Sequence, residues 1–379
     1  MDSVKKITII NQVAGPMCID IANAFVKSNY EVRLYTGDVQ PTYSDLDTNI
    51  NVSLLTRYRR TKTFQRLFTW ILFFLEAFLR LLFSERSRRL LIVSNPPFNF
   101  LLGYCMKKFK KQSFELLIYD VYPDIVVKRA FFSNTSKVVR AWHHLNKKVF
   151  SQASRIITIG DGMRTVLDKY IDSTRVEVVP CWVNSKEIRP IIPKKENWFA
   201  QEFDQADKFT VLYSGNMGES HDFEPLLEAA MQLRMDDKIH FMIVGDGVKK
   251  STIEDFISMQ SLTNITLLPS QDPEVLPYSM ACGDIGFVTT ARYLGNFMIP
   301  SKIFYYLAAG NYVLSISENG SEIDRLLQDS RIGYNIDHRE TRDLARLIRT
   351  AMHKCDREQK LTSAALASKY TPDLAFEFV

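Results

Sequence analysis

Cysteine is scarce in this sequence, and no long apolar run is free of charge. The five cysteines are scattered over 379 residues and never form a C-x-x-C pair, so neither a disulfide framework nor a zinc site is expected. The most apolar run, residues 67–83, contains Glu76 and Arg80, which argues against a transmembrane helix. The start of the chain reads as a β-strand rather than as a secretory signal. These absences predict a cytoplasmic protein.

The composition supplies enough apolar material for two cores. The chain is 46% hydrophobic and 24% charged, and its length exceeds what one hydrophobic core usually serves. The formal net charge of +5 suits phosphate-bearing ligands or an anionic membrane surface. Nothing in the charge pattern requires nucleic acid, and no nucleic-acid partner is expected.

Short β-branched runs alternate with helical stretches along the whole chain. Near-continuous apolar strands of this kind are typical of parallel sheets covered on both faces. The sequence therefore predicts an α/β fold with two doubly wound domains, residues 1–183 and 184–370, joined by a polar, proline-containing linker near residues 183–206. Residues 371–379 are expected to form a last helix that packs back onto the first domain. The runs are "KITII", "EVRLYTG", "LLIVSN", "ELLIYD", "RIITIG", "VEVVP", "FTVLYSG", "IHFMIVGDG", "NITLLP", "DIGFVTT" and "YVLSIS".

A basic amphipathic segment covers residues 57–89. Polar side chains at helical spacing leave a broad Phe/Leu/Trp face between them. Such a face, bordered by cations, fits a helix lying in the surface of an anionic membrane. A core helix with a solvated basic flank fits equally well, and the residues leave both readings open. The polar positions are Arg66, Thr69, Glu76 and Arg80, and the bordering cations are Arg57, Arg59, Arg60, Lys62, Arg86, Arg88 and Arg89, with "KKFKK" at residues 107–111 a further candidate.

Two glycine-containing loops follow predicted strands of the second half. Ligands of open parallel sheets bind beyond the carboxyl ends of the strands. Gly215 and Gly218 would let the backbone approach a ligand closely, and the following helix offers its amides to a phosphate. In the second loop, Gly245 and Gly247 flank Asp246. Each loop is also compatible with an ordinary tight turn, with Asp246 acting as a cap.

The segment "IPSKIFYYLAAG", residues 299–310, supplies the charge that such loops lack. Pro300 suits the first turn of a helix, Ser301 could cap it, and Lys302 adds a cation next to the free amides. If the three loops meet, Lys302 and the helix start would both point at a diphosphate. An ordinary capped helix is the simpler interpretation of this segment alone.

The order of these segments is similar to that in retaining glycosyltransferases of family GT4, in particular the branch that makes bacterial surface polysaccharides. Segments of the type YAGNLG, VGDG, LP…AAADIGL and PSK…EYLAAG recur in that branch. Here they stand as "YSGNMG", "VGDG", "LPYSMACGDIGF" and "IPSKIFYYLAAG". In the first half, "YDVYPD" (residues 119–124) resembles the DLWPE-type segment of that branch. "VVPCWVNSKEIRP" resembles its entry into the second domain, so the likeness covers nearly the whole chain.

The resemblance implies the GT-B architecture, with two Rossmann-like domains facing each other across a cleft. The C-terminal domain would hold a nucleotide-sugar, most simply a UDP-sugar, and the N-terminal domain an acceptor. The implied activity is retaining transfer of the sugar to a hydroxyl of a lipid-linked or polysaccharide acceptor, by a peripheral protein at the cytoplasmic face of the membrane. A metal-independent reaction without a cofactor is expected, because a lysine and a helix dipole would already stabilise the developing negative charge. No DxD stretch is placed to hold a metal diphosphate.

The resemblance also assigns roles to single residues. Lys302 would neutralise the departing diphosphate, and Asp120 would assist proton removal from the acceptor, although a helix cap explains Asp120 equally well. The other donor-side candidates are Gly215, Asn216, Gly218, Gly245, Asp246, Gly247, Pro300, Ser301, Tyr305 and Glu322, and the acceptor-side candidates are Gly15, Pro16 and Tyr122.

Three positions depart from the pattern of that branch. Its two glutamates are replaced by Phe297 and Tyr305, and its basic residue after the GNLG-type loop is replaced by Glu219. A phenol offers one oxygen where a carboxylate accepts two hydrogen bonds, so Tyr305 or Glu322 would have to compensate. The departures keep two alternatives open: a nucleotide-sugar epimerase of GT-B type, and a nucleotide-binding subunit with impaired catalysis.

Overall fold

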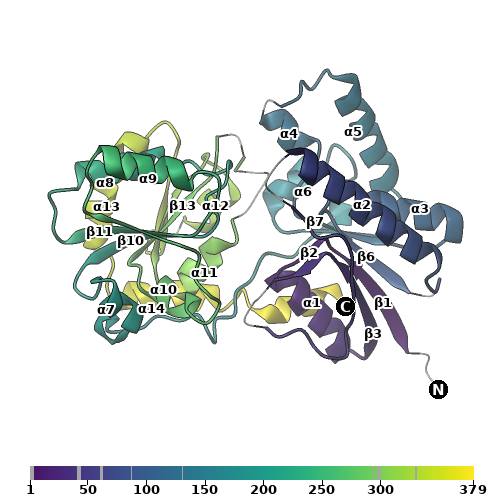
Figure 1. Cartoon of the computed structure of the whole chain (residues 1–379), viewed down its shortest axis with the longest axis horizontal. Coiled ribbons are helices and arrows are strands. Elements are labelled where there is room, and N and C mark those ends of the chain that lie inside the picture. Colours follow the sequence, from purple (N-terminus) through teal and green to yellow (C-terminus); the bar gives the residue numbers. More distant parts are fainter. Residues whose placement is uncertain are drawn as a thin grey trace. The chain divides into compact units, whose positions relative to one another are not determined.

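The computed structural model describes residues 4–40, 44–59, 63–86, 88–129, 131–292, 294, 295, 297, 300–328 and 331–379. The chain divides into two compact units, each built on its own sheet (Figure 1). The N-terminal unit consists of Met1–Pro180 and Pro372–Val379, and the C-terminal unit of Cys181–Thr371. The division at Pro180 lies close to the boundary expected from the sequence.

A parallel sheet forms the middle of the N-terminal unit. Its strands have the order β5-β3-β1-β6-β7-β8-β9, and all neighbours in it run parallel. The order reverses between β1 and β6, where the carboxyl ends of the strands form a ligand-binding edge in doubly wound folds. The strands are β1 (Lys5–Ile10), β3 (Tyr30–Thr36), β5 (Asn51–Leu54), β6 (Arg89–Val93), β7 (Glu115–Ile118), β8 (Arg155–Thr158) and β9 (Val176–Val178), with a separate pair β2 (Val13–Ala14) and β4 (Asp38–Val39).

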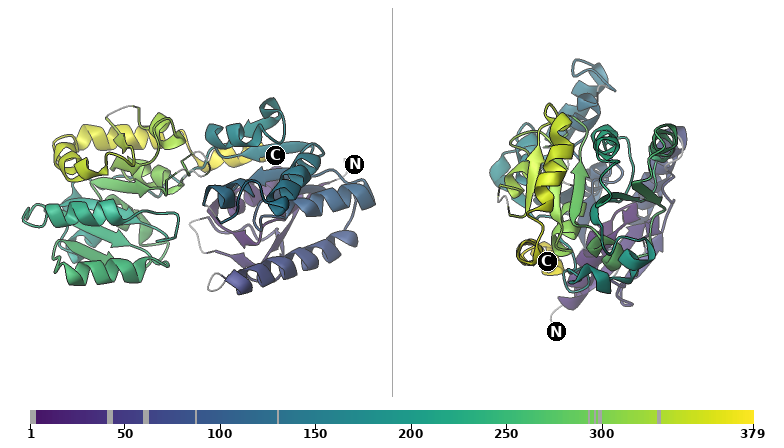
Figure 2. Two further views of the ribbon diagram at one scale, coloured as in Figure 1. Left: turned by 90° about the horizontal axis from the view of Figure 1, so that it is seen from above. Right: turned by 90° about the vertical axis from the view of Figure 1, so that its left-hand side faces the viewer.

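Helices cover both faces of this sheet, because the crossovers on either side of β1 run in opposite directions. One face carries α1, against which the C-terminal η4 packs, and the other carries α2 and α3, which pack together (Figures 1 and 2). The helices are α1 (Pro16–Lys27), α2 (Thr63–Leu82), α3 (Phe100–Lys110), α4 (Asp124–Lys128), α5 (Lys137–Phe150) and α6 (Asp161–Leu167), with 3-10 turns η1 (Ser173–Arg175) and η4 (Pro372–Phe378).

The C-terminal residues return to the N-terminal unit as the 3-10 turn η4. Arg89 donates to the carbonyl oxygens of Phe378 (3.3 Å) and Val379 (2.7 Å). Arg155 donates to the carbonyls of Phe378 (3.3 Å) and Glu377 (2.6 Å). Both arginines come from strands at the sheet, so the backbone ends of this turn are held by charge-assisted hydrogen bonds.

The long helix α2 is apolar on two sides. Phe73, Ala77 and Leu81 are fully buried. Glu76, a polar residue of this helix, forms hydrogen bonds within the protein. Its carboxylate accepts from the amide (2.7 Å) and the hydroxyl (2.9 Å) of Thr56. The core interpretation is therefore correct for one side of α2, and the interfacial interpretation stays a prediction for the other side. The exposed apolar side consists of Phe64, Leu67, Phe68, Ile71, Leu75, Leu79 and, just beyond the helix, Phe83.

Several predicted surface cations of this segment are used inside the N-terminal unit. Arg88 is 1% exposed and bonds Glu31 at 2.9 Å, and Arg89 bonds Glu115 at 2.8 Å. Lys110 donates to the last carbonyls of α2, among them that of Leu81 at 2.9 Å, and caps that helix end. The expected basic border is correspondingly smaller than the sequence suggested, and Arg60 and Lys62 lie outside the described residues.

The C-terminal unit repeats the same plan. Its parallel sheet has the order β12-β11-β10-β13-β14-β15, which reverses between β10 and β13. Helices α8, α9 and α13 cover one face, and α10, α11 and α14 the other (Figure 1). The elements are β10 (Phe209–Ser214), β11 (Ile239–Val244), β12 (Ile265–Leu268), β13 (Ile285–Thr289), β14 (Tyr312–Ile316), β15 (Gly333–Ile336), α7 (Trp198–Glu202), α8 (Glu224–Gln232), α9 (Lys250–Met259), α10 (Leu276–Ala281), α11 (Lys302–Ala308), α12 (Glu322–Leu326), α13 (Leu344–Met352), α14 (Arg357–Ala367), η2 (Lys194–Glu196) and η3 (Thr341–Asp343).

The segment expected as a linker is folded into the C-terminal unit. Val183, Ile188 and Phe199 are buried. Lys194 forms a part-buried ion pair with Asp284 at 2.7 Å, and Lys360 of α14 pairs with the same carboxylate at 3.1 Å. One of the polar residues that suggested a linker, Lys194, thus fixes this segment to Asp284, the residue just before β13.

Candidate functional site

The loops after β10 and β11 lie against each other at the carboxyl edge of the C-terminal sheet. The amide of Gly215 donates to the carbonyl of Val244 (2.9 Å), and the amide of Met217 donates to the carbonyl of Asp246 (2.8 Å). The two glycine-containing loops identified in the sequence are therefore joined backbone to backbone.

Glycine is required in these loops because of both conformation and space. Gly215, Gly245 and Gly247 have φ angles of 133°, 147° and 147°, a region that side chains rarely adopt. A Cβ at Gly245 would collide with the carbonyl of Gly215, and one at Gly247 would collide with the backbone of Met217. The sequence placed these glycines correctly in turns, and the structure adds that two of them keep the loops in contact.

Lys302 of α11 extends to the same loops. Its Nζ lies 3.8 Å from the ring centroid of Tyr213, the residue one before the end of β10. A Cβ built on Gly215 would lie 3.2 Å from this Nζ. The helix is fixed to the strand by Tyr306, whose hydroxyl accepts from the amide of Ser214 at 2.7 Å. Lys302 therefore lies beside the predicted phosphate loop, although the two are far apart in the sequence.

The Lys302 ammonium is buried, and none of the described residues accepts a hydrogen bond from it. Burial lowers the pKa of Lys302 from its ordinary value of 10.5 to about 7. A buried cation that has no acid partner is costly. An anion bound at Gly215 would supply the missing partner and raise this pKa again.

The remaining donor-side candidates have different surroundings. Pro300 is buried, Ser301 and Asn216 are exposed, and Tyr305 is half-buried. Ser301 makes no side-chain cap bond, so the expected capping role is wrong. The exposed Asp246 carboxylate accepts from the amide of Gly247 at 2.8 Å, as in the tight-turn interpretation.

Among the described residues, neither Glu322 nor the altered positions supply an acidic partner for Lys302. The Glu322 carboxylate pairs with Arg325 at 3.1 Å. Phe297 is 8% exposed and Glu219 is exposed. Lys249 donates to the carbonyl of His221 at 2.6 Å.

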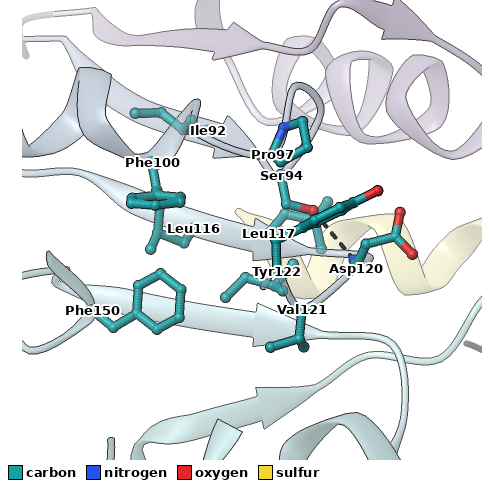
Figure 3. Close-up of a pocket in the computed structure, with 11 residues that line it drawn as sticks. Ile92, Ser94, Pro97, Phe100, Leu116, Leu117, Asp120, Val121, Tyr122 and Phe150 are labelled. Atoms are coloured by element: carbon teal, nitrogen blue, oxygen red, sulfur yellow. Dashed lines mark hydrogen bonds between the residues drawn. The ribbon is translucent and has the colours of Figure 1, made fainter. Parts of the chain in front are cut away.

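A second candidate site follows β6 and β7 in the N-terminal unit. A small pocket there has an apolar inner end that includes Phe100 and Phe150, and its rim is formed by Ser94, Asp120 and Tyr122 (Figure 3). The Ser94 hydroxyl accepts from the amides of Tyr119 (2.9 Å) and Asp120 (3.4 Å). Figure 3 shows the Asp120 carboxylate and the Tyr122 hydroxyl on the same side of the pocket, away from the two phenylalanines.

Burial changes the acid–base behaviour of this rim. It raises the pKa of Asp120 from 3.8 to about 6, against the opposing charge of Arg129. It also raises the pKa of Tyr122, with the Asp120 charge adding to the effect. A carboxylate with a pKa near neutrality is well suited to accept a proton. Asp124, four residues on, is instead bonded to Lys169 and Tyr170.

The other acceptor-side candidates lie at the start of α1. Gly15 is the N-cap of this helix and Pro16 its first residue. Both follow β1 and β2, so they share the carboxyl edge of the sheet with Asp120. A Cβ at Gly15 would lie 3.3 Å from Oε1 of Gln40, the end of a flexible side chain.

Among the helices that the structure describes, none is long and apolar enough to cross a bilayer. Within the same residues, no three His, Cys, Asp or Glu side chains are grouped so that they could hold a metal ion.

The family model "Glycosyl transferases group 1" matches residues 194–367. The chain contains a glycosyltransferase group 1 domain. This domain includes β10 to β14, both glycine loops and Lys302, and it lies within the C-terminal unit.

Two curated relatives extend the match beyond the glycosyltransferase domain. The Pseudomonas aeruginosa protein named "Probable glycosyltransferase WbjE" is 27% identical over 271 residues, which are 70% of this chain and 64% of that protein. WcaI of Escherichia coli (strain K12), named for colanic acid biosynthesis and glycosyl transfer, is 29% identical over 167 residues, or 44% of this chain and 41% of that protein. The chain thus matches less than two thirds of the length of either relative.

A solved structure shows the same two-unit fold. Anabaena Alr3699/HepE in complex with UDP-glucose has a TM-score of 0.71 and covers 98% of this chain and 97% of its own, at 15% sequence identity. This fold is GT-B, with one parallel α/β sheet in each unit, as the sequence predicted.

Several residues around Lys302 and the Asp120 rim could not be identified from the sequence. Tyr213 lies in an ordinary strand, and only the fold shows that its ring supports Lys302. Arg66 was read as part of a surface face, yet its Nε is buried. Trp70 belongs to the broad apolar face predicted for this helix, and its ring stacks on Tyr58, with ring centroids 6.2 Å apart.

Proposed function

We propose that this chain is a retaining glycosyltransferase that moves a sugar from a nucleoside diphosphate, most simply a UDP-sugar, to a hydroxyl of a lipid-linked or polysaccharide acceptor. The proposal rests on the group 1 domain and on one observation, the buried Lys302 ammonium that no described residue pairs. The name of WcaI and the UDP-glucose bound by HepE support the acceptor class and the donor class respectively.

Lys302 and the glycine loops would bind the diphosphate. The flexible backbone at Gly215 allows phosphate oxygens to approach, and the ammonium 3.8 Å above the Tyr213 ring lies within reach of the same space. During transfer the bond between the anomeric carbon and the diphosphate oxygen breaks, and its electron pair goes to that oxygen. Lys302 would stabilise this charge as it develops. Electrostatic stabilisation of a developing charge is usually the largest single contribution to catalysis.

Asp120 would act on the acceptor. The attacking hydroxyl forms a new bond to the anomeric carbon, and its proton must leave as this bond forms. A carboxylate whose pKa is about 6 is ionised at neutral pH and can take that proton. We expect the reaction to need no metal, because Lys302 already opposes the charge of the leaving group; insensitivity of the rate to a chelator tests this point.

The exposed side of α2 would lie on an anionic membrane. Its seven exposed apolar residues are aromatic or aliphatic throughout, and exposed cations such as Arg57, Arg59, Arg80 and Arg86 lie on the same segment. Apolar insertion and attraction to anionic lipid then add together. The test is flotation with anionic and neutral liposomes: Phe68→Glu should abolish flotation with anionic vesicles. Trp70→Glu is not suitable, because this ring packs inside the unit.

Transfer itself is tested with labelled UDP-sugars and a membrane extract as the source of acceptor. Wild type should label a lipid-extractable or polymeric product, and Lys302→Met should not. Tight UDP binding without turnover or donor hydrolysis would contradict the transferase proposal and favour an impaired subunit. Donor conversion without any acceptor would instead favour an epimerase.

A further inference from the structure

The segment that follows β7 and carries Asp120 is anchored at both of its ends. At its start, the backbone amide of Asp120 donates to the Ser94 hydroxyl at 3.4 Å. At its end, the Asp124 carboxylate is bonded to Lys169 and Tyr170. Among the described residues, none donates a hydrogen bond to the Asp120 carboxylate itself (Figure 3). The position of this carboxylate is therefore set by the backbone of its segment.

Tyr122, two residues after Asp120, is held by helix α5 through both its backbone and its ring. Its carbonyl accepts from Nδ2 of Asn146 at 2.6 Å. Its ring stacks on Trp142, with ring centroids 6.1 Å apart and an angle of 14° between the ring planes. Asn146 is fully buried and Trp142 is half-buried. Because these two residues are one helical turn apart, they lie on one face of α5 and hold the same point of the segment.

Helix α5 is itself fixed to the end of the segment and to the core. Nδ1 of His143 lies 2.6 Å from the Tyr170 hydroxyl. That hydroxyl donates to Asp124, so its oxygen accepts from the imidazole N–H. The last residue of α5, Phe150, is buried and lines the inner end of the pocket. The helix is therefore a rigid support for the segment rather than a second loop.

A proton acceptor is sensitive to small displacements. It acts only within hydrogen-bond reach of the hydroxyl that it deprotonates, and a displacement of about 1 Å can lower the rate about 100-fold. Since the Asp120 carboxylate has no hydrogen bond of its own to another described residue, a shift of Tyr122 would be passed on to it through the backbone.

We propose that Asn146 and Trp142 are positioning residues, which hold Tyr122 and thereby place the Asp120 carboxylate at the rim of the pocket. Asn146 fixes the backbone of the segment, and Trp142 fixes the Tyr122 ring beside the carboxylate. Neither side chain is assigned a contact with substrate. This inference rests on the proposed transferase function, in which Asp120 takes the proton of the acceptor hydroxyl.

The kinetic test uses the full chain with Asn146→Leu, which keeps a similar volume without the donor, and Trp142→Leu. Each should lower kcat about 10-fold to 100-fold. KM for the UDP-sugar should stay unchanged, because the predicted donor residues belong to the C-terminal unit. Trp142→Phe keeps a ring for the stack and should recover most of the rate. His144→Leu, at an exposed residue of the same helix, is the matched control and should match wild type.

A second measurement follows Asp120 directly and needs no activity. A carboxyl-carbon NMR titration identifies its signal as the one that Asp120→Asn removes. In wild type this group should titrate with a pKa of about 6, because of burial. In Asn146→Leu the segment should loosen and admit water, so the pKa should fall towards the ordinary value of 3.8. A merely structural role of Asn146 would lower the melting temperature without moving this titration.

The inference is overturned if both leucine variants keep the wild-type kcat and the wild-type titration of Asp120. It is also overturned if kcat falls only with the folded fraction, measured by thermal melts, while Asp120 still titrates near pH 6. Trp142→Leu alters a half-buried side chain, so it carries the test if Asn146→Leu does not fold. Absence of transfer by wild type from every donor would instead refute the transferase, and the titration would still decide whether these residues position Asp120.

Discussion

Replacing Lys302 with methionine should stabilise the free C-terminal unit and weaken its binding of a nucleoside diphosphate. Burial lowers the Lys302 pKa from 10.5 to about 7, which corresponds to about 4 to 5 kcal/mol against the charged form. The contact with the Tyr213 ring returns about 2 kcal/mol. Methionine has a similar volume and no charge, so the free energy of unfolding should rise by about 2 to 3 kcal/mol near pH 6. The melting temperature should rise by about 5 to 10 °C.

The gain should depend on pH in a way that identifies its origin. In the folded chain Lys302 loses its proton near pH 7, whereas the unfolded chain keeps it to about pH 10. Stability rises with pH wherever the unfolded state binds more protons. The penalty is therefore complete below about pH 7 and fades between pH 7 and about pH 10. The stability difference between Lys302→Met and wild type should shrink over the same range.

The affinity for nucleotide should fall in Lys302→Met, although the free energy of unfolding rises. Loss of the cation opposite a buried diphosphate should weaken UDP-glucose binding at least about 30-fold. The assay uses UDP-glucose as the ligand instead of UDP, because UDP has a terminal phosphate that titrates near pH 6. Titration calorimetry and thermal melts on the same samples give both values. The control is Lys238→Met, which removes an exposed lysine of the same unit and should change neither.

One variant must show both effects for the reasoning to hold. If Lys302→Met melts at or below the wild-type temperature, the ammonium is not a destabilising group in the free chain. If it binds UDP-glucose as tightly as wild type, the lysine is not at the diphosphate. Either result refutes the role assigned to this side chain.

Three further predictions follow from other parts of the structure. The transfer rate should fall as pH drops below about 6, where Asp120 becomes protonated, and Asp120→Asn should lower kcat about 100-fold or more and remove this acid limb. Asp284→Ala, which leaves two part-buried lysines unpaired, should lower the free energy of unfolding by about 3 to 5 kcal/mol in urea titrations; Asp207→Ala, at an exposed pair, should cost less than about 1 kcal/mol. Gly245→Ala should abolish UDP binding because its Cβ meets backbone, whereas Gly320→Ala, at a φ of 76° with nothing near its Cβ, should retain it; equal UDP binding by the two variants would contradict the packing argument.

The parallel sheets could be predicted because their strands are buried on both faces. Every apolar run identified in the sequence became a strand, from β1 to β14. The strands without such a run were missed: β2 and β4 contain two residues each, β5 has exposed or half-exposed residues throughout, and β15 carries the exposed Tyr334. Edge strands bury less side-chain surface, so their pattern is weaker.

The candidate sites could be predicted only as far as local motifs reach. Glycine loops and a lysine at a helix start are visible in the chain, so the residues of the C-terminal site were named in advance. What surrounds them depends on contacts between distant residues: Tyr213 beneath Lys302, or Trp70 beside Arg66. A charge pattern cannot tell an exposed arginine from a buried one, which is why Arg88 was placed on the surface although Glu31 pairs with it inside the unit.

The return of η4 to the N-terminal unit has a consequence for the order of folding. Residues 372–379 provide the carbonyl groups that Arg89 and Arg155 bind, and they are made after the whole C-terminal unit. A ribosome must therefore synthesise the second unit completely before the first can finish its packing, so the unit that starts first is completed last.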